Sequence, residues 1–535
     1  MILYYFIMFT VTNIFKNLKY EYQRFKSITS IVFNKLMSTN IKTNLIVAVD
    51  SNWGISKNNQ IPWSIKEDSN FFQDVTKRCY IGNKKNATIM GKNTWNALPD
   101  NYRGLKDRIN IVVSNTMSDE ELVNSNITKS DIYLAKSLTD AVELCKTLDL
   151  GKIFICGGNS IYKEALEKLS VDEIYLTSIQ KNYNCDNIFP YESFNKLLDN
   201  YKEHMAKEFV VNDKNNNDNV TVIFKKLYKG EMPQQFNQNE DEQQYLNLME
   251  NILRTGHFRQ TRNSKTWSKF GETIKFDLSK GFPLLTTKKV FFRGIFEELS
   301  FFLKGDTNAK HLSEKGVKIW DDNSSRQFLD SVGLSYYDEG DIGPMYGFNW
   351  NHYGANYKGM NEDYTGQGLN QLDDCIRLLK TDPYSRRILM TVFNPLVAKQ
   401  GCLWPCHSIV IQWYVEDNNR LSMSCYNRSQ DYFLGSNFNL TMSSLLVHLF
   451  CEVINNDVTY NGPKFKPGRL IMNLGDTHLY EDHYEQSIRQ ILREPYKFPQ
   501  LVIKRNVTKL SDFKYEDFEL VDYQCYPNII AKMTA

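Results

Sequence analysis

The chain has 535 residues, which is too long for one ordinary hydrophobic core and predicts two or three domains. Hydrophobic residues make up 42% and aromatic residues 13%, a composition typical of globular rather than disordered proteins. The 64 Lys and Arg against 62 Asp and Glu leave a formal charge of +2, which gives no indication of a charged surface for nucleic acid or membrane. Any anion site must therefore come from a local arginine cluster.

The ten cysteines and eight histidines show no C-x-x-C pair and no metal-site spacing, so we expect no metal. A reducing compartment, the cytoplasm, is the simpler expectation for these thiols. Residues 1–41 are predicted to be an N-terminal extension, and the first 15 of them are largely apolar and aromatic. This run is short for a membrane span, and lysines follow it instead of preceding it as in a signal peptide. The sequence leaves open whether it is a dispensable extension, an anchor or an organelle-targeting segment.

Residues 42–228 are predicted to form a first domain. Short apolar runs predict strands at 45–50, 87–90, 108–114, 152–156, 173–177 and 220–224, with helices starting near Lys66, Gly91 and Gly158. Strands that alternate with helices indicate an α/β domain with a central, mainly parallel sheet. Glycines between a strand and a helix allow backbone N–H groups to approach a phosphate, although a plain turn is the alternative for each.

The same stretch contains a series of landmarks in a fixed order. They are Ile61-Pro62-Trp63 with Asp68 and Phe72, then Met90-Gly91-Lys92-Asn93-Thr94-Trp95, then Arg108, Gly157-Gly158 and Thr177. This set resembles dihydrofolate reductase, which implies reduction of dihydrofolate by NADPH. Asp68 would be the acidic side chain that hydrogen-bonds the pterin and supports protonation at N5. Desolvation there should raise its pKa, whereas an exposed charge in a first helical turn is the alternative.

The resemblance implies further binding roles in this domain. Thr177 would support Asp68, Phe72 would pack on the folate, and Arg108 would pair with the glutamate carboxylate of the folate. Lys92 stands where arginine is common, so the 2′-phosphate would meet a point charge instead of a planar fork. The residues expected to contact NADPH are Ala48, Ile55, Lys92, Thr94, Ser114, Gly157 and Gly158.

Residues 229–242 are polar and rich in Gln and Asn, and they predict a linker to a second domain at 243–535. The central stretch of that domain is a predicted hairpin, with strands at 408–415 and 421–426. The hairpin is expected to bring Cys406 close to Arg428, Ser429, Asp431 and Asn439. Cationic neighbours would lower the pKa of the thiol and make Cys406 a nucleophile, whereas a buried structural cysteine is the alternative.

Eight motifs of the second domain together resemble thymidylate synthase and imply an α+β fold. They are Phe282-Pro283-Leu284-Leu285-Thr286-Thr287-Lys288-Lys289, Gly305-Asp306-Thr307-Asn308, Gly343-Pro344-Met345-Tyr346-Gly347, Ser385-Arg386-Arg387, Pro405-Cys406-His407, Arg428-Ser429-x-Asp431, Gly435-x-x-Phe438-Asn439 and Gly475-Asp476-Thr477-His478-Leu479-Tyr480. The resemblance implies that dUMP and 5,10-methylenetetrahydrofolate give dTMP and dihydrofolate. Cys406 would add to C6 of the pyrimidine.

The resemblance also implies roles for the residues around the thiol. Glu298 would relay protons through water, Trp320 and Tyr346 would cover the folate, and Asp431 would assist through its backbone and the folate. Asn439 would read O4 and N3–H of uracil, whereas aspartate at this position suits cytosine, so dUMP is the expected substrate. The other expected dUMP contacts are Arg262, Arg386, Arg387, His407, Arg428, Ser429, Asp431, His478 and Tyr480.

Arg386 and Arg387 would come from the other subunit, so the resemblance implies an obligatory homodimer.

The chain departs from the family at three places. The loop at Arg262 is one residue shorter, which leaves Thr261 as the alternative neighbour of the phosphate. Trp404 stands beside the nucleophile, and Gln430 replaces the usual cysteine.

We therefore expect one chain that makes dTMP and reduces the dihydrofolate that this reaction produces. Two alternatives stay open from the sequence. A pyrimidine hydroxymethylase is disfavoured by Asn439. A synthase-like domain with impaired catalysis that binds ligand or RNA is suggested by the altered Arg262 loop and by Trp404.

Overall fold

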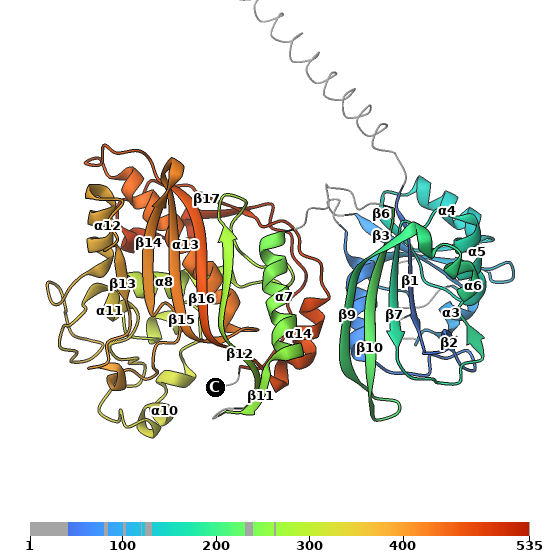
Figure 1. Ribbon diagram of the computed structural model, residues 1–535, viewed down its shortest axis with the longest axis horizontal. Coiled ribbons are helices and arrows are strands. Elements are labelled where there is room, and N and C mark those ends of the chain that lie inside the picture. The colour runs from blue at the N-terminus through green and yellow to red at the C-terminus, as the bar shows by residue number, and fades with distance from the viewer. Residues whose placement is uncertain are drawn as a thin grey trace, which may run out of the picture. The chain divides into compact units, whose positions relative to one another are not determined.

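The computed structural model describes residues 41–79, 84–99, 103–118, 120–122, 131–230, 239–261 and 264–533. The chain divides into two compact units, Met1–Met232 and Pro233–Ala535 (Figure 1). The N-terminal extension up to residue 40 and the predicted phosphate ligand Arg262 lie outside the described residues.

An eight-stranded sheet forms the centre of the first unit. Its order is β5 (Ile132–Ala135), β4 (Arg108–Val113), β3 (Lys85–Gly91), β6 (Leu150–Ile155), β1 (Thr43–Val49), β7 (Glu173–Ile179), β10 (Asp218–Lys229) and β9 (Tyr201–Asp213). Neighbouring strands from β5 to β7 are parallel, and β10 and β9 join in antiparallel fashion. The predicted mainly parallel sheet is confirmed. A small antiparallel pair, β2 (Gly54–Ser56) and β8 (Asn187–Ile188), lies outside this sheet.

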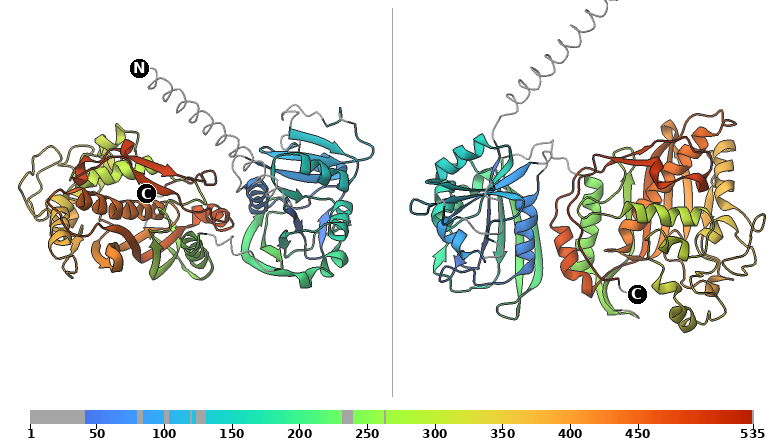
Figure 2. Two further views of the ribbon diagram at one scale, coloured as in Figure 1. Left: turned by 90° about the horizontal axis from the view of Figure 1, so that it is seen from above. Right: turned by 180° about the vertical axis from the view of Figure 1, so that it is seen from behind.

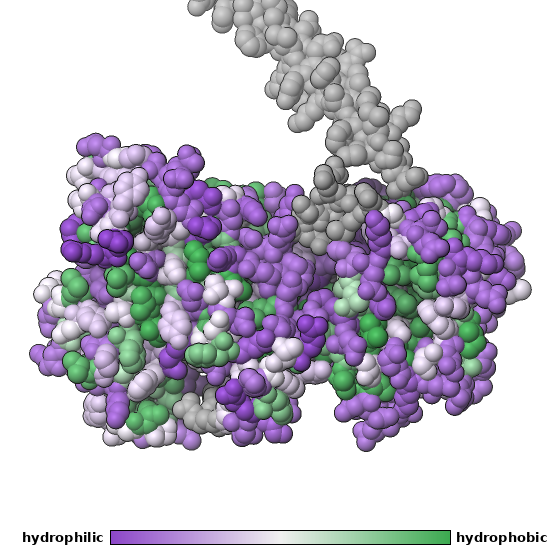
Figure 3. Space-filling model, in the orientation of Figure 1, coloured by the Kyte–Doolittle hydropathy of each residue, from purple (hydrophilic) through white to green (hydrophobic). Residues whose placement is uncertain are grey.

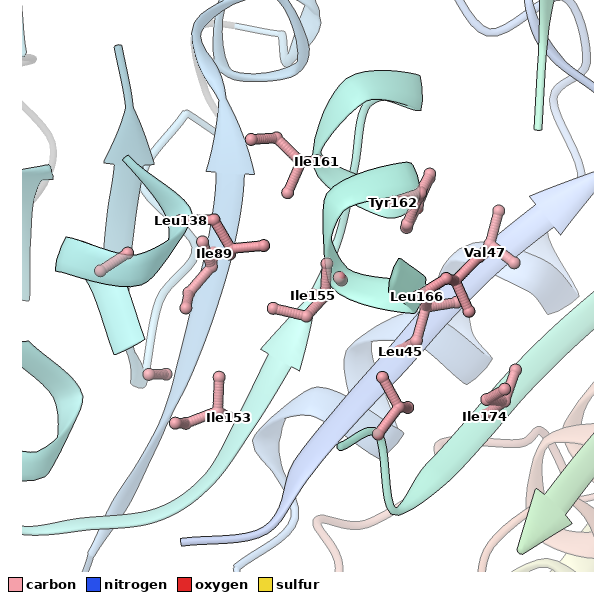
Figure 4. Close-up of a cluster of buried hydrophobic side chains, with 14 of the residues drawn as sticks. Leu45, Val47, Ile89, Leu138, Ile153, Ile155, Ile161, Tyr162, Leu166 and Ile174 are labelled. Atoms are coloured by element: carbon pink, nitrogen blue, oxygen red, sulfur yellow. The ribbon is translucent and has the colours of Figure 1, made fainter. Parts of the chain in front are cut away.

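Helices cover both faces of this sheet (Figures 1 and 2). Tyr162 and Leu166 of one helix pack into the cluster that contains Leu45 and Ile155 (Figure 4). On the other face, Phe71 packs edge-on against Phe224, with ring centroids 5.1 Å apart. The helices are α2 (Lys66–Lys77), α3 (Lys92–Ala97), α4 (Leu138–Thr147), α5 (Asn159–Lys168) and α6 (Tyr191–Asn195).

A six-stranded sheet forms the centre of the second unit. Its order is β11 (His257–Gln260), β12 (Lys265–Asp277), β16 (Lys466–Tyr480), β15 (Arg420–Asp431), β14 (Val410–Glu416) and β13 (Leu389–Thr391). Only the β15–β16 pair is parallel among these neighbours. The predicted hairpin is β14 and β15, which pair from Val410 with Tyr426 to Glu416 with Arg420. A separate pair is formed by β17 (Gln500–Ile503) and β18 (Phe518–Val521).

One face of this second sheet is covered by a long apolar helix, α13 (Gly435–Asn456). The ring of Trp413 on β14 stacks on the ring of Phe450 on α13, with centroids 4.2 Å apart. Among the described residues α13 is the one helix long and apolar enough to cross a membrane, and most of it is buried inside the unit. The helices are α7 (Glu240–Thr255), α8 (Phe292–Leu303), α9 (Lys310–Ser313), α10 (Arg326–Ser331), α11 (Gly347–Asn351), α12 (Gln371–Thr381), α13 (Gly435–Asn456) and α14 (Tyr484–Ile491).

The opposite face of the second sheet is exposed in the single chain. Side chains alternate along β14, so that Val410 and Tyr414 point away from α13 and are 40% and 67% exposed. Leu389 on β13 and Tyr426 on β15 continue this face at 48% and 40%. Hydrophilic residues predominate on the visible surface of both units, with apolar residues among them (Figure 3).

Candidate active sites

Asp68 lies in the first turn of α2, where it faces β7. Thr177 of β7 and Trp63 both hydrogen-bond its carboxylate. Burial raises the pKa of Asp68 to about 6, and these two hydrogen bonds oppose the rise because they stabilise the charged form. The expected raised pKa is therefore present, and Thr177 is in contact with Asp68 as the sequence suggested.

Phe72 follows Asp68 by one helical turn, so both side chains lie on one face of α2. The guanidinium of Arg108, at the start of β4, lies 6.0 Å from the Phe72 ring. Arg108 is buried and donates to the Thr76 hydroxyl at 2.7 Å and the Lys106 carbonyl at 3.0 Å. Burial lowers the pKa of Arg108 to about 10, which keeps the guanidinium charged at neutral pH. The structure thus places a fixed cation beside an aromatic ring near Asp68.

Two strand-to-helix turns meet at the glycines of the first unit. The Gly91 N–H donates to the Gly157 carbonyl at 2.8 Å, and α5 begins immediately after Gly158. Gly157 has a φ of +108°, and a Cβ there would lie 2.9 Å from the Tyr162 ring. A Cβ on Gly158 would lie 3.3 Å from the Thr94 hydroxyl. A side chain at Gly157 would clash with Tyr162 and one at Gly158 would crowd Thr94, so glycine keeps the backbone of this turn open to close approach by a phosphate group.

The other residues predicted to hold NADPH come from neighbouring elements. Ala48 pairs with Thr177 in the β1–β7 register, and Ile55 lies in β2. Ser114 follows β4, and its N–H donates to the Ala135 carbonyl. The Lys92 ammonium lies 3.5 Å from the carboxylate of Glu121.

In the second unit, Cys406 lies against Tyr346, the residue before α11. The Cys406 N–H donates to the Tyr346 hydroxyl at 2.9 Å, and its Sγ lies 3.4 Å from the same oxygen. The Tyr346 ring stacks on His407 at 4.6 Å. Tyr346 has a φ of +33°, a strained value for a residue other than glycine. Sequence reasoning placed Tyr346 over the folate and missed its contact with the thiol.

Arg428 and Ser429 reach the Cys406 loop, as the predicted hairpin required. The Arg428 guanidinium donates to the Pro405 carbonyl at 2.7 Å, and the Ser429 N–H donates to the Cys406 carbonyl at 3.3 Å. Burial raises the pKa of Cys406 above its ordinary value, and the hydrogen bond with Tyr346 and the field of Arg428 oppose this rise only in part. The expectation of a lowered pKa is therefore wrong for the single chain, because desolvation outweighs one arginine. Trp404 is half-exposed and lies against Phe393.

Glu298 is buried on α8 and accepts a 3.0 Å hydrogen bond from the Trp320 indole. Burial raises the pKa of Glu298 to about 7, against the effect of that hydrogen bond. The Trp320 and Tyr346 rings lie 6.0 Å apart, so a single aromatic wall joins Glu298 to Cys406. The neighbouring Glu297 instead pairs with Lys315 at 2.7 Å.

The carboxyl ends of the parallel strands β15 and β16 bring the remaining polar residues together. Asp431 pairs with His478 in the register, and its carboxylate accepts from the backbone of Phe433 and Leu434. The rings of His478 and Tyr480 meet edge-on at 5.2 Å.

Asn439, in the first turns of α13, donates from Nδ2 to Gln430 at 3.3 Å. Gln430 also accepts from Asn427 at 2.7 Å. Sequence reasoning noted Gln430 only as a departure from the family and did not single out Asn427. Asn427 continues the buried face of Met423 and Cys425, which was the available signal for it, whereas Gln430 falls on the face of the exposed Tyr426 and Arg428, so alternation gave no signal for its burial.

Arg386 and Arg387 do not join this cluster within one chain. The Trp413 N–H donates to the Ile388 carbonyl, and β13 runs antiparallel to β14. The two arginines therefore lie toward the Glu416 end of β14, whereas Cys406 precedes its Val410 end. Both arginine side chains are exposed. Among the described residues, no group of three His, Cys, Asp or Glu side chains is placed to hold a metal ion.

A folate-type reductase unit and a pyrimidine-methylating unit on one chain define a class of two-site enzymes. The dihydrofolate reductase family matches residues 42–226, and the thymidylate synthase family matches residues 243–535. The chain is 37% identical to the bifunctional dihydrofolate reductase-thymidylate synthase of Zea mays, over 91% of this chain and 96% of that protein. It is 36% identical to the protein of the same name from Paramecium tetraurelia, over 93% of this chain and 100% of that protein. It is also 36% identical to bifunctional dihydrofolate reductase-thymidylate synthase 2 of Arabidopsis thaliana, over 91% of this chain and 88% of that protein.

The chain belongs to the bifunctional dihydrofolate reductase–thymidylate synthases. It is an enzyme of dTMP synthesis and of dihydrofolate reduction, with NADPH and methylenetetrahydrofolate as the cofactor and cosubstrate of its two activities. The comparisons do not favour the hydroxymethylase or the binding-domain alternative.

Proposed function

We propose that Cys406 is the nucleophile of the synthase site, that Glu298 is its proton relay, and that Tyr346 orients the thiol. The contact of Cys406 with the Tyr346 hydroxyl carries this proposal, because it fixes Sγ at one end of the wall that leads to Glu298. C5 of uracil is a poor nucleophile. Addition of the thiolate to C6 creates an enolate whose C5 attacks the one-carbon unit.

Proton movement in this scheme falls to Glu298. A carboxyl group with a pKa of about 7 exchanges protons readily at neutral pH, which suits a group that gives and takes protons through water. Asn439 would hold the edge of the pyrimidine, His478 and Tyr480 the ribose, and Asp431 the folate. After transfer, hydride from the folate carrier completes the methyl group, and the folate leaves as dihydrofolate.

Replacing Trp320 by phenylalanine is expected to move the pH dependence of the synthase. The indole hydrogen bond stabilises ionised Glu298, so its loss should raise the pKa of Glu298 above about 7. The limb of the kcat/KM profile for dUMP that reports Glu298 should shift to higher pH. Tritium release from [5-³H]dUMP between pH 5.5 and 9 measures this. An unshifted limb in the folded variant would show that Trp320 does not influence the pKa of Glu298 in the working enzyme.

For the phosphate of dUMP, we propose a cage of Arg428, Ser429 and Arg262 with Arg386 and Arg387 of a second copy of the chain. Guanidinium groups bind phosphate through paired hydrogen bonds, so several arginines must converge. Two observations support a homodimer. Arg386 and Arg387 lie toward the wrong end of β14 to reach Cys406 in their own chain, and the sheet face with Val410, Tyr414 and Tyr426 is exposed and partly apolar. Positive charge brought by the second copy would also lower the pKa of Cys406.

Mixed dimers test this arrangement. We expect Cys406→Ala and the double variant Arg386→Ala/Arg387→Ala each to be inactive alone, and co-expressed copies with different tags to recover about a quarter of wild-type synthase activity. Half of the dimers are then mixed, and each has one site with an intact thiol and intact arginines. Co-expressed Cys406→Ala and Asn439→Ala are the control, because both residues belong to one chain's site and no intact site forms. No recovery in the first mixture would contradict donation across the dimer.

For the reductase site, we propose that Asp68 binds the pterin and supports protonation of N5, with Thr177 orienting its carboxylate. Phe72 and Arg108 would hold the body and the glutamate of the folate. Bound NADPH supplies hydride. The Gly157–Gly158 turn, Thr94, Lys92 and Ser114 would hold its phosphates, and Ala48 and Ile55 would lie along it. The positive φ of Gly157 and the lack of room for a side chain there support the assignment.

The two activities are tested together by product balance on the full chain. With dUMP, methylenetetrahydrofolate and NADPH, we expect one NADPH oxidised for each dTMP formed, and no NADPH oxidation when dUMP is omitted. Formation of dTMP with accumulation of dihydrofolate would contradict an active reductase site.

We also propose that the enzyme works in the cytoplasm, because its ten cysteines show no C-x-x-C pair and no metal-site spacing, and a reducing compartment is the simpler setting for such thiols. Imaging of the full chain and of a chain that begins at residue 42 tests this. Organelle localisation that depends on residues 1–41 would contradict it.

A further inference from the structure

Three buried amide side chains form a chain of hydrogen bonds in the synthase unit. Asn427 Oδ1 accepts from the Ser408 N–H at 2.9 Å, and Asn427 Nδ2 donates to Gln430 Oε1 at 2.7 Å. The same Oε1 accepts from Asn439 Nδ2 at 3.3 Å. Asn427 and Gln430 are each 1% exposed and Asn439 is 8% exposed. The chain of bonds therefore runs from the loop of the nucleophile to the residue that faces the pyrimidine.

The direction of these bonds is fixed by two backbone groups, the Ser408 N–H and the Asp431 carbonyl, which accepts from Gln430 Nε2 at 3.4 Å. A backbone N–H can only donate, so the Ser408 N–H requires the oxygen of Asn427 to face it. The amide nitrogen of Asn427 then faces Gln430 and requires an oxygen there. That oxygen in turn requires the nitrogen of Asn439. Each amide taken alone could be rotated by 180°, but the two backbone groups remove this freedom from all three.

The orientation of Asn439 decides which base the site can read. With one Nδ2 hydrogen bonded to Gln430, Asn439 offers its Oδ1 as acceptor and its second N–H as donor. Uracil presents N3–H and O4, which match this pair. Cytosine presents an unprotonated N3 and an amino group at C4, which would match an Asn439 rotated by 180°.

We propose that Gln430 is a positioning residue that holds Asn439 in the orientation that accepts uracil and rejects cytosine. This inference rests on the proposed function of the synthase site. The resemblance to thymidylate synthase gives cysteine as the usual residue at this position, so Gln430 supplies an amide oxygen that the usual residue lacks. The ordinary alternative is that Gln430 only satisfies buried polar groups and affects stability but not base choice.

Three variants of the full chain separate these readings. Gln430→Met keeps the size but removes the shared acceptor, so Asn439 can rotate. Gln430→Glu keeps an oxygen that accepts from both asparagines, so the orientation is retained. Asn427→Asp still accepts from Ser408 but cannot donate, so Gln430 is expected to give up its bond to the Asp431 carbonyl and turn its nitrogen toward residue 427. The same nitrogen then faces Asn439 and requires the oxygen of Asn439 there.

Binding of dUMP and of dCMP is measured by calorimetry, with tritium release from [5-³H]dUMP as a second readout. We expect the ratio of the dCMP and dUMP dissociation constants to fall by about ten-fold or more in Gln430→Met and Asn427→Asp, and to stay near the wild-type value in Gln430→Glu. Gln371→Met is the matched control. Gln371 is also a buried glutamine with three hydrogen bonds, to Asn349 and Thr391, but it lies outside the amide chain. It should lower stability and leave the ratio unchanged.

Thermal unfolding shows which variants are folded, and Asn427→Asp carries the test if Gln430→Met is not. If the wild-type chain and the folded variants all prefer dUMP to the same degree, the positioning role of Gln430 is overturned and the proposed synthase function still stands. A wild-type chain that binds neither nucleotide and releases no tritium would instead overturn the proposed synthase function, and the inference with it.

Discussion

Replacement of Cys406 by alanine should abolish tritium release from [5-³H]dUMP, with a fall of roughly 10⁴-fold or more, as for loss of other covalent nucleophiles. The reason is that C5 of uracil gains nucleophilic character only after a thiolate has added to C6. Cys406 is the thiol positioned for this step, because it lies between the Tyr346 hydroxyl and the arginine-bearing end of β15. The assay uses the full chain with methylenetetrahydrofolate.

The first unit provides an internal control for this variant. NADPH oxidation with added dihydrofolate should be unchanged in Cys406→Ala, which shows that the first unit is intact, and thermal unfolding reports the fold of the second unit. Cys402→Ala is a matched control, because Cys402 is a buried thiol four residues away that contacts the Met345 sulfur. Substantial tritium release by Cys406→Ala would contradict the thiolate mechanism.

Asp68→Asn should lower the reductase rate by about 10²- to 10⁴-fold while synthase activity stays intact. Asparagine keeps the size of the side chain but cannot exchange a proton. The pKa of Asp68 is about 6, so the protonated fraction of the wild type falls as pH rises above 6, and the rate of hydride transfer should fall with it. Single-turnover NADPH oxidation between pH 5 and 9 measures both effects. A variant that keeps most of the wild-type rate at pH 7 would exclude Asp68 from the chemistry.

The same substitution should stabilise the first unit. A carboxyl group whose pKa rises from 3.8 to about 6 on folding disfavours the folded state above pH 6, because the charged form is desolvated there. Between these two pKa values the native state binds more protons, so stability falls as pH rises. Removing the charge should therefore raise the free energy of unfolding at pH 7 by about 1–3 kcal/mol, measured by urea denaturation. Lower stability would mean that the lost rate reflects damage to the fold.

The strands that carry the sites could be predicted because their patterns are strong. The runs at β1, β4 and β6 are apolar and bounded by turns, and the alternation in β14 distinguishes its buried face from its exposed one. The strand β9 was not predicted. β9 lies at the edge of the sheet, and most of its first half is exposed. Exposed edge strands tolerate charged residues, so this segment lacks the apolar run by which the other strands were predicted.

Chemistry that depends on desolvation or on distant contacts was harder to predict. The sequence shows Arg428 near Cys406 through the hairpin, but the burial that raises the thiol pKa depends on packing around Tyr346, which is 60 residues away in the chain. The amide chain through Gln430 likewise joins Ser408, Asn427 and Asn439 from separate elements. They meet only in the folded unit, where β14 pairs with β15 and α13 packs against the sheet.

The most direct test of the central claim is to trap the bond between Cys406 and the nucleotide. With 5-fluoro-dUMP and methylenetetrahydrofolate, the C5 fluorine cannot leave as a cation, so the sulfur–C6 bond should persist after transfer has begun. Intact-mass measurement followed by peptide mapping should locate the adduct on the peptide that contains Cys406, and Cys406→Ala should carry none. A folded, dimeric chain with an active reductase that forms no adduct, or forms one on another cysteine, would contradict the assignment of Cys406 as the nucleophile.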